Sequence, residues 1–367
     1  MGMARSADDH AFSRRSGEGD LLSNWLVSLG RRARPRLAVA PWSSSLGLGR
    51  TLLALGSALT LIATPTDVLL SGGGVIPRAG CSGDSAAGAF CVLPVWDGAL
   101  MRWCAVAALL LVASGWRPRL TAVPHWYLSW SLLVNSAVPD GGDQLAAILT
   151  LLLIPVGLTD RRRWHWQAPA PAPSSPDHDD RTDPGHAGTA ALIAYAAIML
   201  IRLQVAAVYF QSSIAKLGVA EWADGTAMYY FLQHQLFGAP PWLSPVTDIV
   251  THSPLGVSLL TWTPLAIEFA IAVAILLRPP ARRVLLVLGF AFHATIGLTM
   301  GLVSFGLAMC GALLLYLLPI GHQLRFRRPA TMMQQVRVRL AVLGRAASVK
   351  APTRIGVTAS GAVDRHV

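Results

Sequence analysis

Lys216 is the residue whose type most clearly suggests chemistry in this sequence. The chain has 30 lysines and arginines, of which only Lys216 and Lys350 are lysines. An arginine guanidinium stays protonated in proteins, whereas a lysine amine removed from water can lose its proton and act as a base. Lys216 ends an apolar segment, so it is a candidate base. The alternative is a structural lysine whose long side chain reaches the membrane interface.

Four further ionisable residues lie inside apolar segments, where a charge is costly and usually marks a site or a structural pair. They are Arg202, Glu268, His293 and Arg102, and Arg102 lies near a helix end, where its long side chain can reach the interface. Glu268 has two open interpretations: it neutralises Arg202 across two helices, or its carboxylate points toward Lys216 or a substrate. His293 is either an interhelical hydrogen-bonding group or an acid or base in a pocket.

The segment 217–243 is rich in aromatic residues and contains no lysine or arginine. It includes Trp222, Asp224 and Tyr230. We expect it to lie as a short helix in the external membrane interface and to cover one end of the site. His234, in the same segment, is either a polar site group or an ordinary interfacial residue.

A membrane-embedded helix bundle must position these residues. The chain of 367 residues is 53% hydrophobic and 13% charged, whereas soluble domains carry about 25% charged residues. Eight apolar segments approach the length that a hydrocarbon core requires of a spanning helix. They are residues 48–70, 97–116, 120–137, 144–159, 189–215, 254–277, 284–300 and 302–320. The sequence therefore predicts an all-α, polytopic transmembrane bundle with eight spans.

Arginine clusters favour one orientation of this bundle. They occur in alternate loops between the apolar segments, and the positive-inside rule places those loops in the cytoplasm. We therefore expect both termini to be cytoplasmic, with tails at 1–47 and 321–367 and a disordered Pro-rich linker at 165–187. The basic residues lie in separate loops and not in one patch, so no nucleic-acid partner is expected.

Two cysteines, Cys81 and Cys91, lie in a Gly-rich loop on the expected external side. Because oxidation is permitted there, we expect a disulfide that closes this loop. The alternative is a redox-active pair, although the spacing differs from CxxC. No metal site is expected.

Residues 202–238, RLQVAAVYFQSSIAKLGVAEWADGTAMYYFLQHQLFG, resemble the core motif of the HTTM superfamily. This superfamily includes the vitamin K-dependent γ-glutamyl carboxylases and the bacterial SdpB family. Residues 290–310, FAFHATIGLTMGLVSFGLAMC, resemble a second carboxylase segment with a Phe-His pair. Together with the order of the helices, the resemblance covers roughly residues 48–320.

In the carboxylases, the matching lysine is regarded as the residue that deprotonates vitamin K hydroquinone. The resemblance therefore implies a reduced isoprenoid quinone, vitamin K hydroquinone or menaquinol, as cofactor and Lys216 as base. The carboxylases have an Asn-Asn-His motif before the fourth span, whereas PDGGDQL here puts Asp143 near the position of that histidine. They also have a large lumenal substrate-binding domain, which we do not expect here.

The GGDQ sequence, the short cysteine loop and the string WADGTAMYY are more similar to the SdpB branch. The resemblance implies a role with an SdpA-like partner in the maturation of a secreted antimicrobial or toxin-type peptide. We expect a multi-pass plasma-membrane protein acting at the external face. Two alternatives stay open: a γ-glutamyl carboxylase-like enzyme, and a non-enzymatic scaffold or exporter.

The candidate site then combines residues from four parts of the chain. Its expected catalytic residues are Lys216, His293 and Glu268, and its expected pocket residues are Arg202, Trp222, Asp224, Tyr230, His234 and Asp143.

Overall fold

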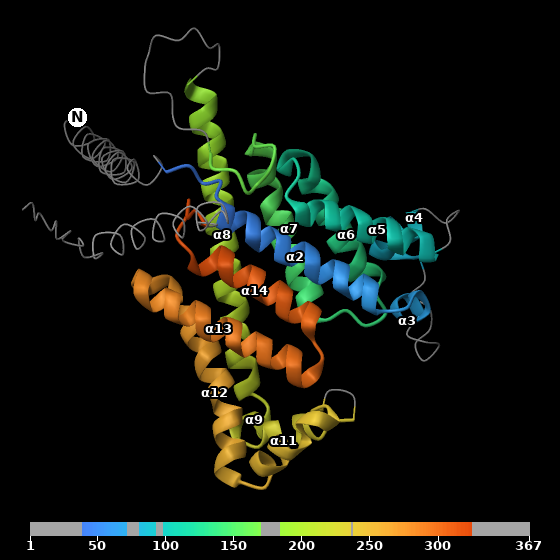
Figure 1. The fold of residues 1–367 in the computed structure, drawn as a ribbon, viewed down its shortest axis with the longest axis vertical. Helices are drawn as coiled ribbons and strands as arrows, with labels where there is room; N and C mark the ends of the chain where they lie inside the picture. The colour runs from blue at the N-terminus through green and yellow to red at the C-terminus, as the bar shows by residue number, and fades with distance from the viewer. Residues whose placement is uncertain (1–38, 72–80, 93–97, 170–183, 236–237, 325–367) are drawn as a thin grey trace, which may run out of the picture. The chain divides into compact units, whose positions relative to one another are not determined.

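The computed structural model describes residues 39–71, 81–92, 98–169, 184–235 and 238–324, and within these ranges every regular element is a helix (Figure 1). The long helices are α2 (Ser44–Ala63), α5 (Gly98–Ser114), α6 (Pro118–Asn135), α7 (Gly141–Thr159), α8 (Pro184–Leu217), α12 (Pro254–Ala272), α13 (Pro279–Met300) and α14 (Val303–Leu317). Shorter elements are α3 (Thr66–Ser71), η2 (Gly83–Ala87), α4 (Ala89–Val92), α9 (Ala220–Ala223), α10 (Ala227–Leu232), η3 (Pro241–Leu243), α11 (Ser244–Thr251) and η4 (Val273–Leu276). The all-helical prediction is therefore correct for the described residues.

Each of the eight predicted apolar segments coincides with a long helix. Five helices in the described ranges are long and apolar enough to cross a membrane, namely Ser44–Ala63, Gly141–Thr159, Gly188–Leu217, Pro254–Leu276 and Pro279–Met300. The apolar helices α5 and α14 are shorter, and α6 carries buried polar residues such as His125 and Asn135. The structure thus supports a membrane protein, while the count of eight spans and the side of the termini stay predictions.

Some helix ends differ from the predicted limits for identifiable reasons. The first segment was expected to continue to residue 70, but α2 ends at Ala63 and Thr64 is extended. Pro65 follows directly, and a residue before proline is disfavoured in helical conformation. At the other extreme, α13 begins at Pro279, five residues before the expected start. Proline is well tolerated in the first turn of a helix.

The core forms where α14 packs between α2 and α13 (Figure 1). Buried residues from α2, α7, α8, α12, α13 and α14 meet there, among them Leu149, Ile201, Ile271 and Leu313. The backbones of α2 and α14 approach closely at Gly311, where an added Cβ atom would lie 2.9 Å from the Gly49 carbonyl oxygen. Small residues at such a crossing allow close packing of membrane helices.

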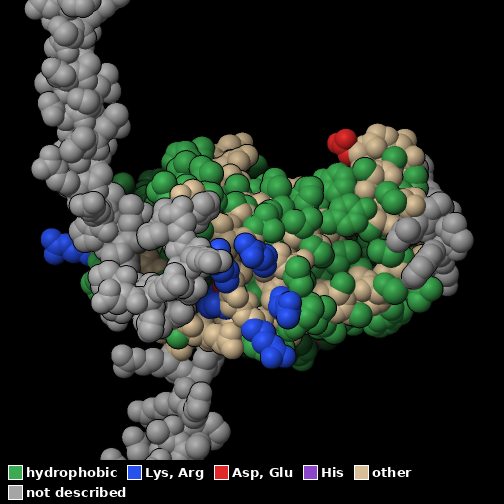
Figure 2. All heavy atoms as spheres, turned by 90° about the horizontal axis from the view of Figure 1, so that it is seen from above, with side chains coloured by type: hydrophobic (Ala, Val, Ile, Leu, Met, Phe, Trp, Pro, Cys, Tyr) green, Lys and Arg blue, Asp and Glu red, His purple; other side chains and the backbone are tan. Residues whose placement is uncertain are grey.

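One end of the bundle collects the arginine-rich connections. Trp42 donates from its indole Nε1 to the Val156 carbonyl at 3.2 Å, which joins the start of α2 to the end of α7. The backbone of Arg117 donates to the Arg163 carbonyl at 2.7 Å, which joins the α5–α6 connection to the same region. Figure 2 shows Lys and Arg side chains gathered on part of the face seen from above. We call this the arginine end.

His165 was expected at the start of the disordered linker, but it is buried at the arginine end. Its ring fills the space left by two glycines, because a Cβ atom on Gly47 or Gly115 would collide with it. Burial, together with the nearby charges of Arg50 and Arg162, lowers the pKa of His165 to about 3. The ordered chain therefore extends beyond residue 165, and α8 begins at Pro184, before the predicted end of the linker at residue 187. The linker residues 170–183 lie outside the described ranges, as do residues 1–38 and 325–367 of the predicted tails.

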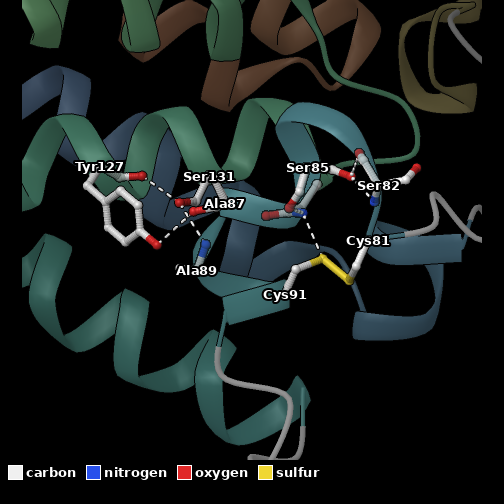
Figure 3. The surroundings of a disulfide bond; sticks show 9 residues. Cys81, Ser82, Ser85, Ala87, Ala89, Cys91, Tyr127 and Ser131 are labelled. Atoms are coloured by element: carbon white, nitrogen blue, oxygen red, sulfur yellow. Dashed lines mark hydrogen bonds between the residues drawn. A yellow bond between two sulfur atoms is a disulfide. The ribbon is translucent and has the colours of Figure 1, made fainter.

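The predicted disulfide between Cys81 and Cys91 is present, with a Cα–Cα distance of 5.7 Å (Figure 3). Hydrogen bonds from α6 hold the closed loop. Asn135 Nδ2 donates to the Ser85 carbonyl at 2.9 Å, and the Ala89 backbone N–H donates to Ser131 Oγ at 3.0 Å. The disulfide therefore fixes a small helical cap on α6.

Candidate functional site

Lys216 and Glu268 form an ion pair between the last turn of α8 and the C-terminal half of α12. The Lys216 side chain is 23% exposed and the Glu268 side chain 7% exposed. Ser212 lies between them, because Lys216 Nζ donates to Ser212 Oγ at 3.1 Å and Ser212 Oγ donates to Glu268 Oε2 at 3.2 Å. The pair is thus bridged by a hydroxyl and open to the surroundings on the lysine side.

Tyr209 and His293 form a second polar pair next to the first. The Tyr209 hydroxyl and His293 Nε2 are 2.7 Å apart, and both side chains are buried. Phe305 of α14 packs edge-on against the imidazole, with ring centroids 5.6 Å apart. His293 Nδ1 is buried without a hydrogen-bond partner in the described chain. An interhelical hydrogen bond was one of the two roles expected of His293.

Helical spacing explains why these groups meet. Tyr209, Ser212 and Lys216 are separated by three and four residues, so they share one face of α8. The two pairs are close enough to interact electrostatically, Glu268 with Tyr209 and Lys216 with His293. We call Tyr209, Ser212, Lys216, Glu268 and His293 the Lys216 cluster.

The aromatic segment after α8 covers the lysine side of this cluster. The Trp222 ring centroid is 5.3 Å from Lys216 Nζ, within the range of a cation–π contact. Phe231 of α10 supports the indole, with ring centroids 5.9 Å apart. The Met228 backbone N–H donates to Thr261 Oγ1 of α12 at 3.2 Å, which ties the segment to the bundle.

A glycine allows this segment to turn back onto α12. Gly225 has a φ of +77°, and a Cβ atom there would lie 2.8 Å from Trp262 Nε1. Only glycine adopts that backbone conformation without strain and leaves room for the indole. The predicted covering of the site by this segment therefore has a structural basis.

Three predicted pocket residues of the same segment lie elsewhere. Asp224, Tyr230 and His234 are exposed to solvent or lipid. Tyr230 and His234 line a separate open hollow with Gln233 and Gln235. They are not members of the Lys216 cluster.

Asp143 has a structural role at the start of α7. Its backbone N–H donates to Asp140 Oδ1 at 2.8 Å, and its own carboxylate accepts from the Asp140 backbone N–H at 3.4 Å. This is a reciprocal capping arrangement that satisfies amides at a helix start. The adjacent Gly142 packs against Phe305, the residue whose ring also touches His293.

Arg202 does not pair with Glu268, so one of the two interpretations of Glu268 is wrong. Arg202 precedes Lys216 by 14 residues, or about 21 Å along a helix. Its guanidinium donates to the Leu318 carbonyl at the arginine end. Glu268 instead pairs with Lys216, which was the alternative interpretation.

Two members of the cluster, Tyr209 and Ser212, were not predicted as site residues. Their spacing in the sequence could have revealed them, because both precede Lys216 by about one or two whole helical turns and so share its helix face. An uncharged hydroxyl in an apolar segment carries much less penalty than a charge, so it stands out less in a sequence.

The comparisons with known proteins agree with this architecture. Residues 183–319 match the HTTM domain family, and this range contains the entire Lys216 cluster. The chain is 36% identical over 291 residues to the uncharacterized protein YitO of Bacillus subtilis strain 168, which covers 78% of this chain and 89% of YitO.

A second relative carries a functional name. The chain is 31% identical over 282 residues to the sporulation-delaying protein SdpB of Bacillus subtilis strain 168, which covers 76% of this chain and 83% of SdpB. No solved structure matches the chain significantly. With five helices able to cross a membrane and this extent of similarity, the chain belongs to the SdpB family of HTTM-domain membrane proteins.

Proposed function

We propose that this SdpB-like protein is a multi-pass plasma-membrane protein that matures a secreted antimicrobial or toxin-type peptide, using proton transfer at the Lys216 cluster. The observation that carries the proposal is the Lys216–Glu268 ion pair, which lies between two apolar helices and is open only partly on the lysine side. Intramembrane ionisable pairs are expensive and commonly functional.

The pairing assigns different roles to the two charges. A carboxylate has acceptor oxygens, whereas an ammonium group can only donate. Glu268 is then the group that accepts a proton, and Lys216 is the cation that stabilises a negative charge developing on the substrate. This role differs from that of an unpaired lysine base, because the Lys216 amine is paired with the Glu268 carboxylate. Ser212 contacts both groups and holds them in register.

A reduced isoprenoid quinone is the proposed cofactor. The residues present suit the polar edge of such a ring, since Lys216 offers a partly exposed ammonium and Trp222 offers an aromatic face 5.3 Å from it. When bound, the quinol would supply an acidic hydroxyl and reducing equivalents. Lys216 would orient that hydroxyl, and Trp222 and Phe231 would limit access of water.

Intact-mass analysis of the secreted peptides tests the proposal in the native host. We expect the mature peptide from the wild type and an unmodified or absent product from Lys216→Ala. Because a lone buried charge could impair folding, the decisive strain carries Lys216→Met together with Glu268→Gln, which leaves no unpaired charge. We expect this double variant to accumulate in the membrane and still lack the mature product.

Mature peptide at the wild-type level from an accumulating double variant would contradict the proposal. The ion pair would then be structural, and the scaffold or exporter interpretation would replace it. A gain of one CO₂ per substrate glutamate would instead identify a γ-glutamyl carboxylase. Deleting an SdpA-like partner in the same host tests whether the chain acts alone. We expect the mature product to be lost in that strain.

A further inference from the structure

Arg202 lines a pocket at the arginine end that the proposed function does not use. The walls come from the start of α2, the middle of α8 and the end of α14 (Figure 1). Apart from Arg202, the lining includes Ser43, Leu46, Ile198, Leu315 and Leu318. An arginine therefore lies among mostly apolar walls, far from the Lys216 cluster.

The Arg202 guanidinium lacks a negative partner in the described chain. The residue is 8% exposed, and the carbonyl of Leu318 is the acceptor for its Nη2 group. Its Nε is buried and has no hydrogen-bond partner among the residues that the structure describes. Arg282 is close enough to repel it electrostatically. Buried charges in proteins are normally paired, so this pocket has an unmet requirement for an anion.

The start of α2 adds positive potential to the same pocket. α2 has 20 residues, begins at Ser44 and has no acidic residue in its first turn. The N-terminal end of a helix carries a partial positive charge that favours anions. The first amides are already occupied, for example Leu46 N–H with Ser43 Oγ at 3.2 Å. Arg202 is therefore the direct ligand, and the helix contributes through its field.

The surface beside the pocket fits acyl chains. Met199 precedes Arg202 on α8 by about one turn and Leu203 follows it directly; they are 41% and 61% exposed. They belong to a helix that is apolar and long enough to cross a membrane. An anion that reaches Arg202 can thus carry hydrocarbon chains that pack on neighbouring residues.

From these observations we propose that the Arg202 pocket binds the phosphate of an anionic lipid headgroup. The phosphate accepts hydrogen bonds from Arg202, Arg282 contributes attraction, and the acyl chains lie against the exposed apolar residues of α8. Basic pockets between membrane helices are a known mode of headgroup recognition. The inference is independent of the proposed function, because it concerns the opposite end of the bundle.

Native mass spectrometry of the purified full chain with added lipid tests this inference. Phosphatidylglycerol and phosphatidylcholine with identical acyl chains differ in net headgroup charge. We expect the wild type to retain phosphatidylglycerol about tenfold more strongly, with most of this preference contributed by the direct ligand Arg202. Equal retention of the two lipids would overturn the proposal. If inorganic phosphate raised the thermal stability of the protein as much as phosphatidylglycerol does, the ligand would be free phosphate and not a lipid headgroup.

Variants localise the binding. Arg202→Gln should bring the preference for phosphatidylglycerol close to parity, whereas Arg283→Gln removes an exposed arginine nearby and should leave it within about twofold. Equal losses in both variants would show that only surface charge matters and would overturn the pocket. If Arg202→Gln does not accumulate, Arg202→Lys keeps the charge but lacks the Nε donor, and we expect a clearly reduced preference. An unchanged preference would contradict direct ligation by the guanidinium.

Discussion

Removing one partner of the Lys216–Glu268 pair should destabilise this protein more than removing both. Lys216→Met leaves the Glu268 carboxylate, which is 7% exposed, with Ser212 as its remaining hydrogen-bonding neighbour. Breaking a buried pair in this way costs about 3–5 kcal/mol of unfolding free energy. Glu268→Gln leaves an ammonium that is 23% exposed and still contacts Ser212 and Trp222. Its cost should be smaller, about 1–3 kcal/mol.

The double variant separates structure from chemistry. Lys216→Met with Glu268→Gln leaves no unpaired charge, so its unfolding free energy should lie within about 1–2 kcal/mol of the wild type. The double-mutant cycle of the wild type, the two single variants and the double variant then gives a coupling energy of about 2 kcal/mol or more between Lys216 and Glu268. Reversible denaturant unfolding in mixed micelles measures all four proteins under the same conditions. Additive losses would refute the reasoning, because they would mean that the two charges do not compensate one another.

Three further predictions concern other parts of the bundle. Tyr209→Phe should cost about 1–3 kcal/mol in the same unfolding assay, because it leaves buried His293 Nε2 without its 2.7 Å partner; a neutral effect would contradict that pairing. The pKa of His165 is lowered to about 3 in the folded protein, so the unfolded chain binds a proton more readily at this residue. The unfolding free energy should therefore fall as pH drops below about 6.5 toward 3. In His165→Gln, the number of protons taken up on unfolding in this pH range should be smaller by about one. Replacing Cys81 and Cys91 by serine should lower the unfolding free energy by about 2–4 kcal/mol in non-reducing buffer, and reductant should affect only the wild type.

The sequence was sufficient to predict the helices and much of the cluster. The apolar segments marked every long helix, and the charged residues Lys216 and Glu268 stood out because charges are rare in apolar segments. Helix limits were less predictable, since Pro65 ended α2 before the apolar pattern did. A local turn signal overrode hydropathy at that point.

The sequence could not decide which charges pair across helices. Glu268 had two possible cationic partners on α8, and only the relative placement of α8 and α12 selects Lys216 over Arg202. Burial of His165 was equally hidden, because its local composition is that of a loop. Its position depends on space left by Gly47 and Gly115, which are distant in the chain. Such choices are made by tertiary packing and not by local propensity.

The central claim is that the Lys216–Glu268 pair takes part in chemistry, and Glu268→Gln tests it most directly. This substitution keeps the size of the side chain but removes the carboxylate that accepts a proton. Its control is Asp160→Asn, which changes the ion pair with Arg162 at the opposite end of the bundle. At equal amounts of membrane protein, the account predicts mature secreted peptide from Asp160→Asn and only unmodified or absent product from Glu268→Gln. Mature peptide from Glu268→Gln at the level of the control would contradict it.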